Sequence, residues 1–156
     1  MCVFCDDPTL TYPEFLAGMA RKAREYGWAI QGVERHGAHP PWAYTVGLTP
    51  LDRPELLVTG MPLQRAARLL NEVATHLLQR EPPRPGERMR VATGPLVEFV
   101  TVEHPDVHLL TAMALHGPAV RGKQVVWSDD RERWPWERGF RGYRGGQPVL
   151  GPRATA

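Results

Sequence analysis

The sequence predicts an α+β fold in which three helices pack against a largely antiparallel sheet of about six strands. Apolar residues recur at helical spacing in three segments, namely 12–26, a second that begins at 61–62, and 105–115. Between these helices, segments with strand character follow one another directly, at 28–33, 42–48 and 55–59, then at 88–93 and 96–103, with a last one at 124–127. Strands without an intervening helix favour antiparallel pairing, in an open sheet or in a split-barrel-like one.

The first predicted helix, at 12–26, has a start signal and a stop signal in the sequence. Thr11 and Glu14 have the spacing of a capping box, in which each side chain bonds the backbone N–H of the other residue. Pro13 is tolerated because the N–H groups of a first helical turn have no partner within the helix. Gly27 then supplies the stop.

We predict that the three strands after this helix form a meander, because only short connections separate them. In 42–48 large residues alternate with small ones, which places Trp42 and Tyr44 on one face of the sheet and Ala43 and Thr45 on the other. The second helix, which begins at 61–62, then presents an apolar stripe to the core. The strands at 88–93 and 96–103 surround Gly94 and Pro95 and are expected to pair as a hairpin.

The segment 128–156 is rich in arginine and aromatic residues and has no regular pattern. Interleaved arginines and aromatic rings can bind nucleic acid, but Glu132 and Glu137 dilute the charge here. Prolines beside tryptophans favour a flap that covers apolar surface of the sheet. Asp129 and Asp130 follow the last strand, where they could hold a cation or act as a base; we favour an acidic turn.

Length and composition indicate a single domain over 1–156, with a flexible amino terminus at 1–10. The formal net charge of +2 does not call for nucleic acid, and no apolar run approaches the length of a membrane span. The amino terminus also lacks the basic flank and apolar stretch of a signal peptide, so we expect a cytoplasmic protein. Several short strand edges are compatible with a homodimer, although no motif requires one.

No sequence motif specifies a reaction. The chain has no G-x-S-x-G, and Ser128 is its single serine, which argues against a serine hydrolase. The glycine patterns of phosphate-binding and dinucleotide-binding loops are missing as well. The sequence therefore leaves open whether the protein is an enzyme.

The ordered motifs PPWAYTVGL, PELLVTG, QVVW and PWERGF…QPVLG resemble the domain-of-unknown-function 4262 family, from about residue 28 to about residue 151. The opening MCVFCDDP is also similar to that of many actinobacterial members. The resemblance implies a bacterial, cytoplasmic, single-domain protein and brings no activity with it. A weaker similarity to flavin-reductase-like split barrels rests on the fold alone and makes a flavin-binding oxidoreductase one alternative.

A second alternative is an interaction module stabilised by zinc. Cys2 and Cys5 have the spacing of half a zinc site, and His36 and His39 could complete a Cys2His2 set. The gap between the two pairs is unlike that of a known zinc finger, and two reduced thiols at a frayed end explain the same residues. We favour the frayed end.

The leading hypothesis is a groove for a small molecule or a protein partner, beside the loop 36–41 and the strand that carries Trp42 and Tyr44. The small residues on the other face of that strand leave a trough for a planar ligand or a crossing backbone. The alternative, which we slightly favour, is that a closely packed helix fills this trough. If the trough is open, the ligand-binding residues are His39, Trp42, Tyr44, Thr45, Glu55 and Trp136.

Overall fold

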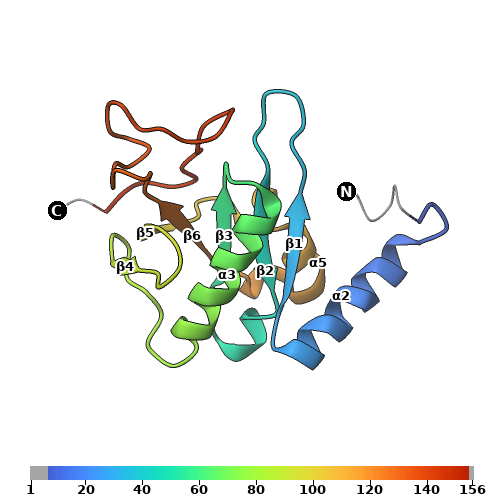
Figure 1. Cartoon of the computed structure of the whole chain (residues 1–156). Coiled ribbons are helices and arrows are strands. Elements are labelled where there is room, and N and C mark those ends of the chain that lie inside the picture. Colours follow the sequence, from blue (N-terminus) through green and yellow to red (C-terminus); the bar gives the residue numbers. More distant parts are fainter. Residues whose placement is uncertain (1–6, 155–156) are drawn as a thin grey trace.

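A computed structural model describes residues 7–154 of the 156-residue chain, and its centre is a six-stranded sheet (Figure 1). The strands are β1 (Ala29–Val33), β2 (Trp42–Val46), β3 (Glu55–Thr59), β4 (Arg88–Arg90), β5 (Leu96–Thr101) and β6 (Gly122–Trp127). Their order across the sheet is β1-β2-β3-β6-β5-β4, and all neighbours are antiparallel except β3 and β6. The prediction of an α+β fold with a largely antiparallel sheet is confirmed, and the sheet is open.

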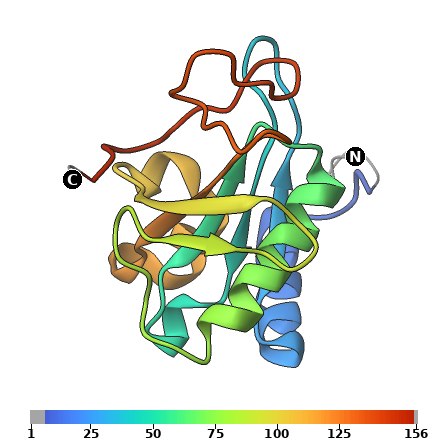
Figure 2. The same cartoon turned by 60° about the vertical axis from the view of Figure 1, so that its left-hand side comes forward.

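The helices cover both faces of the sheet (Figures 1 and 2). One face carries α3 (Leu63–Leu77), whose buried residues pack on β1, β2 and β3. The other face carries α2 (Tyr12–Tyr26) and α5 (Leu110–His116), which both contact β2. Short helical turns connect these elements: η1 (Thr49–Leu51), α4 (Pro105–His108) and η2 (Gly117–Ala119). No helix among residues 7–154 is long and apolar enough to cross a membrane.

A local sequence signal explains where the first helix begins, whereas the break in the third one coincides with the burial of Leu109. The Thr11 hydroxyl accepts the Glu14 N–H at 3.3 Å, and the Glu14 carboxyl group accepts the Thr11 N–H at 2.8 Å. The predicted capping box is therefore confirmed. The predicted helix at 105–115 is instead divided into α4 and α5 at Leu109, which has φ −116° and ψ 48°. Leu109 is fully buried, so the break allows its side chain to reach the core.

A separate apolar core lies on each face. The residues under α3 include Leu56, Val58, Phe99 and Trp127, and they form the larger core. The opposite core, under α2 and α5, is built from a different set: Phe15, Met19, Ala29, Tyr44, Val46, Leu57, Leu109, Ala112 and Val120. Strand periodicity sends alternate residues to the two cores, which is why β2 and β3 are buried on both sides.

The C-terminal segment, residues 128–154, continues from β6 and wraps around the end of the sheet (Figures 1 and 2). Trp134 is buried against Val100 and Val126 and stacks on the half-buried Trp136 with ring centroids 5.5 Å apart. Arg88 covers the free face of Trp134 and Arg153 that of Trp136. Farther along this segment, Gly146 lies so close to Gly60 (φ +73°), the residue after β3, that a Cβ at residue 60 would lie 2.2 Å from the Gly146 carbonyl oxygen.

Candidate functional site

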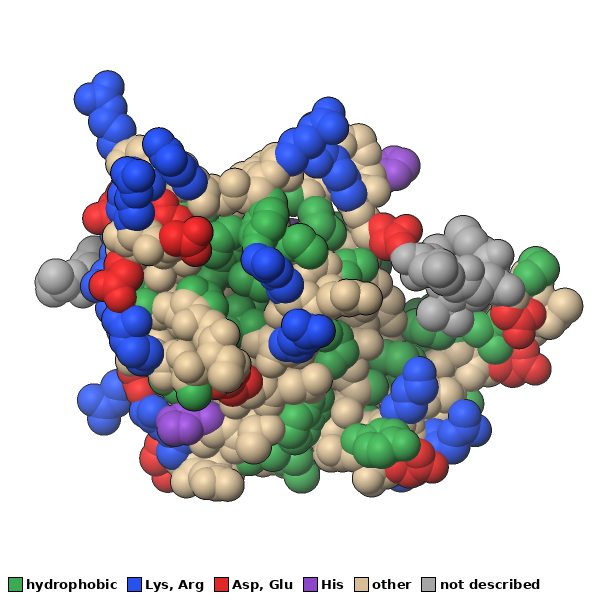
Figure 3. Space-filling view, in the orientation of Figure 1, with side chains coloured by type: hydrophobic (Ala, Val, Ile, Leu, Met, Phe, Trp, Pro, Cys, Tyr) green, Lys and Arg blue, Asp and Glu red, His purple; other side chains and the backbone are tan. Residues whose placement is uncertain are grey.

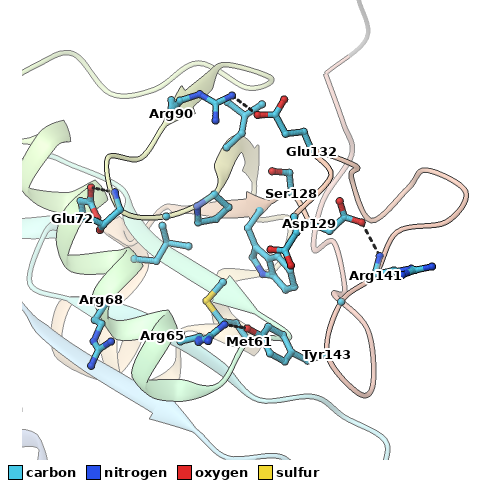
Figure 4. Close-up of a pocket in the computed structure, with 18 residues that line it drawn as sticks. Met61, Arg65, Arg68, Glu72, Arg90, Ser128, Asp129, Glu132, Arg141 and Tyr143 are labelled. Atoms are coloured by element: carbon cyan, nitrogen blue, oxygen red, sulfur yellow. Dashed lines mark hydrogen bonds and ion pairs between the residues drawn. The ribbon is translucent and has the colours of Figure 1, made fainter.

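A cavity of about 920 Å³ lies at the carboxyl ends of β3 and β6, the parallel pair of the sheet (Figure 4). Met61 follows β3 and Ser128 follows β6, and both residues line it. The remaining walls come from α3, the turn between β4 and β5, and the C-terminal segment. The described lining residues are Met61, Arg65, Arg68, Leu69, Glu72, Arg90, Thr93, Gly94, Pro95, Leu96, Trp127, Ser128, Asp129, Asp130, Glu132, Arg141, Gly142 and Tyr143.

The floor of the cavity is apolar and rigid. Met61, Leu69 and Trp127 belong to the core under α3 and are at most 6% exposed. The indole N–H of Trp127 donates to the Thr59 carbonyl oxygen at 3.0 Å, which ties β6 to β3 through a side chain. Gln147 pairs with the backbone N–H and carbonyl of Trp127, so the C-terminal segment holds the same residue from the other direction.

Two side chains of α3 anchor the walls. The Glu72 carboxyl group accepts the Ala92 N–H and the Thr93 hydroxyl, each at 2.8 Å, and so fixes the turn between β4 and β5. Arg65 is hydrogen-bonded to the Tyr143 hydroxyl and lies over its ring, which fixes the C-terminal segment. Because the two residues are seven apart, they lie on the same face of the helix. One helix face therefore positions both walls.

Asp129 shapes the loop that leaves β6. Its carboxyl group accepts the backbone N–H groups of Arg131, Arg133 and Arg141 at 2.9–3.0 Å and pairs with the Arg133 guanidinium at 3.0 Å. Burial alone would raise the pKa of Asp129, but these hydrogen bonds and the positive charge of Arg133 lower it to about 2. The predicted acidic turn is therefore present, and Asp129 acts as the acceptor that organises it.

Ser128 differs from its neighbour because its hydroxyl group is buried without a partner. The residue is 3% exposed, and its Oγ makes no hydrogen bond within the described part of the chain. The guanidinium groups of Arg68 and Arg141 at the rim are also without a hydrogen-bonding partner among residues 7–154. The exposed arginine side chains can donate hydrogen bonds to a molecule in the cavity, beside the covered Ser128 hydroxyl.

The residues predicted to line a groove lie in several places. Thr45 and Glu55 are fully buried and bonded to each other, with the Thr45 hydroxyl donating to Glu55 at 2.6 Å. The other Glu55 oxygen accepts the Gly47 N–H, the Thr49 N–H and the Thr49 hydroxyl. Ala43, which lies on the same face of β2 as Thr45, belongs to the core under α3. The small residues of β2 therefore contribute to packing under a helix.

The other predicted residues are also engaged within the protein. Trp42 donates its indole N–H to the His108 carbonyl oxygen, and the Tyr44 hydroxyl accepts the Thr111 N–H in the core under α5. Trp136 stacks between Trp134 and Arg153. His39 is exposed and forms a backbone bridge with His36 across the tip of the β1–β2 loop. None of the six lies among the described residues that line the cavity.

The β1–β2 loop, beside which the groove was predicted, touches the C-terminal segment. Arg35 donates to the Arg144 carbonyl oxygen, and a Cβ at Gly145 would lie 3.4 Å from the side chain of Pro40. For the zinc hypothesis, Cys2 and Cys5 lie outside the described residues. Among residues 7–154 no group of three or more potential metal ligands comes together. The zinc site stays a prediction, which metal analysis of the purified protein tests.

The sequence predicts a turn at Asp129, but it does not indicate that Arg65, Arg68 and Asp129 come together. The available signal was the single serine of the chain, which directly follows a strand that ends in tryptophan. A small polar residue at the carboxyl end of a buried strand is a common position for a binding group in sheets with parallel strands. The parallel pairing of β3 with β6 was the missing information.

The comparisons with known proteins identify one relationship. A family model described as "Domain of unknown function (DUF4262)" matches residues 22–141. The comparison with curated proteins and the comparison with solved structures each gave no match. The matched range includes α3, β3, β6 and the end of the loop that Asp129 organises.

Proposed function

Because the chain belongs to the DUF4262 family, whose description specifies no activity, we propose from the cavity itself that the protein binds a small organic molecule at the carboxyl ends of β3 and β6. A volume of about 920 Å³ lies within the range of small-molecule sites, roughly 300–1,000 Å³. The floor is apolar and charged side chains surround it, so the cavity offers both apolar surface and polar groups that can orient a ligand. The proposal moves the binding site away from the β1–β2 loop.

The buried hydroxyl of Ser128 is the observation that carries the proposal. Burying a hydroxyl group without a partner costs about 1–3 kcal/mol, and the fold could avoid this cost with alanine at the same position. Ser128 sits next to Asp129, whose carboxyl group has every oxygen engaged. A ligand that reaches and hydrogen-bonds Ser128 explains why this buried hydroxyl lacks a partner while the neighbouring carboxyl group is saturated.

The proposal is for binding, and it includes no catalytic step. A serine nucleophile needs a base within hydrogen-bonding reach, most often histidine. The described lining of the cavity contains no histidine or lysine, and Asp129, with its pKa of about 2, is a weak base. The arrangement therefore supports recognition of a molecule.

A fragment screen followed by NMR tests the proposal. Isotope-labelled full-length protein is titrated with a library of small aromatic and aliphatic fragments, and perturbed backbone signals are mapped. We expect binders to shift the signals of Leu69, Trp127 and Ser128. Substituting Ser128→Ala should weaken their binding severalfold, whereas Thr75→Ala, which removes a hydroxyl from α3 outside the cavity, should leave it unchanged.

Two results would overturn the proposal. One is a screen in which no fragment perturbs the signals around the cavity. The other is a set of binders whose shifts cluster elsewhere, for example around His39 and the β1–β2 loop, which would restore the groove predicted from the sequence.

A further inference from the structure

We infer that the molecule bound in this cavity is an organic acid, with its anionic group held by Arg65 and Arg68 and its apolar body placed against Met61, Leu69 and Trp127. The inference rests on the proposed function and adds the chemical class of the ligand. It follows from the hydrogen-bonding groups that the protein leaves without partners around the cavity.

The cavity has equal numbers of basic and acidic lining residues, four arginines and four carboxylic acids among the described residues, but the acids are largely occupied. Glu72 binds the turn between β4 and β5, and Asp129 binds its own loop. Glu132 forms an ion pair with Arg90 across the rim. Of the acidic residues in the described lining, Asp130 alone has no such internal bond.

Most of the lining arginines, in contrast, keep unused hydrogen-bond donors. Arg90 is paired, but the side chains of Arg68 and Arg141 have no internal partner among residues 7–154, and Arg65 makes its one side-chain hydrogen bond to the hydroxyl of Tyr143. A guanidinium group carries five N–H donors, so most donors of these three side chains remain available. Donors therefore outnumber acceptors around the cavity, and a ligand rich in acceptors is the complementary one.

The N-terminal end of α3 adds positive potential at the cavity. The helix begins at Leu63 after Pro62, and no side chain caps its first N–H groups. Met61, just before the helix, and Arg65, in its first turn, both line the cavity. The partial positive charge of a helix N-terminus favours an anion nearby, and arginine binds carboxylate through two parallel hydrogen bonds.

The floor excludes a ligand that is polar throughout. Met61, Leu69 and Trp127 offer hydrocarbon and indole surface, and the partly exposed ring of Tyr143 lies beside Arg65 (Figure 4). In the space-filling view, hydrophobic side chains are visible at the centre of this face, with basic side chains next to them (Figure 3). A molecule with an apolar, preferably planar body and one acidic group satisfies both surfaces.

The test compares matched pairs of probes. Aromatic carboxylic acids, such as indole-3-acetic acid and 2-naphthoic acid, are titrated into the full-length protein beside their primary amides, which have nearly the same shape and no charge. We expect the acids to bind about tenfold more tightly than the amides, since a charge-assisted bidentate pair is the difference. In the double variant Arg65→Gln, Arg68→Gln this preference should fall below about threefold.

The control variant is Arg21→Gln, which removes an exposed arginine of α2 that does not line the cavity and should keep the full preference for acids. Unchanged amide affinity in the double variant shows that the cavity is intact. Amides that bind as tightly as acids, or a preference that survives the double substitution, overturn the inference while the proposed function stands. If neither acids nor amides perturb the cavity signals, the proposed function fails as well.

Discussion

Polar clusters lie near both ends of β3. They contain similar residues but differ in whether their hydrogen-bonding groups have partners inside the protein. At the beginning of β3, Glu55 accepts hydrogen bonds from Thr45, Gly47 and Thr49, and all of its carboxyl oxygens are used. Beyond its other end, around Met61 and Ser128, hydroxyl and guanidinium groups line a cavity without internal partners. The first cluster joins two strands, whereas the second borders the cavity, with exposed arginine side chains and a covered Ser128 hydroxyl.

The difference shows what separates a structural polar cluster from a candidate binding site. A buried polar group is tolerated when it is hydrogen-bonded, and the protein can supply that bond itself or leave it to another molecule. Glu55 belongs to the first kind, and Ser128 to the second. Residue type does not distinguish them, because a threonine or serine with a nearby acid occurs in both places.

The largest expected effect is on the saturated cluster. Replacing Glu55 with glutamine introduces an NH₂ group where the native oxygens face only donors, including the Gly47 and Thr49 N–H groups. At least one buried donor is then left without an acceptor. We expect the free energy of unfolding to fall by about 3 kcal/mol, measured by urea denaturation.

The matched control for this substitution is Glu25→Gln, which makes the same chemical change at an exposed position of α2 and should alter stability by less than about 0.5 kcal/mol. Equal effects of the two substitutions would show that the Glu55 cluster is not a structural connection and would remove the contrast between the two ends of β3.

The second prediction concerns the loop that forms one wall of the cavity. The pKa of Asp129 is lowered from 3.8 to about 2 in the folded protein, so its ionised form stabilises the fold. This contribution is complete above the unfolded pKa of about 3.8 and is lost as the pH falls towards 2. We expect Asp129→Asn to lower the free energy of unfolding by about 2 kcal/mol at neutral pH.

The variant should also lose less stability than the natural protein between pH 4 and pH 2, measured by denaturation at each pH. A steeper loss in the variant would contradict the assignment of the low pKa to Asp129. The expected smaller loss would support the contrast between two adjacent residues, Asp129 with a fully hydrogen-bonded carboxyl group and Ser128 with an unpartnered hydroxyl group.

The fold could be predicted from the sequence where the signals are local. The capping box of Thr11 and Glu14, the apolar stripe of α3 and the alternating residues of β2 each lie within a few residues of the chain. Each defines an element by its own periodicity or cap. The break at Leu109 was missed because it depends on how deeply that side chain enters a core formed by other elements.

The cavity could not be predicted because its walls come from four separate segments, near residues 61–72, 90–96, 127–132 and 141–143. The bonds that join them span long separations, such as Arg65 to Tyr143 across 78 residues. The residues chosen from the sequence lie mostly on β2 and its loop, with Glu55 on β3 and Trp136 in the C-terminal segment. The polar groups of Trp42, Tyr44, Thr45 and Glu55 found hydrogen-bonding partners inside the protein, which periodicity does not reveal.

The smallest predicted effect has the opposite sign and tests the open cluster directly. Ser128→Ala removes a buried hydroxyl group that has no internal partner in the described chain, so nothing is left unsatisfied and the desolvation cost disappears. We expect the free energy of unfolding of the ligand-free protein to rise by up to about 1 kcal/mol. Thr45→Val is the matched substitution at the other cluster, where the hydroxyl both donates to Glu55 and accepts the Leu56 N–H, and it should lower the same quantity by about 1.5 kcal/mol. Urea denaturation of the two variants beside the natural protein measures both changes.

If Ser128→Ala destabilises the protein as much as Thr45→Val does, the Ser128 hydroxyl has a structural partner, and the reason for assigning it to a ligand is gone. If stability rises while fragment binding weakens, the hydroxyl is retained at a cost to the fold, which is the behaviour expected of a group that binds a ligand.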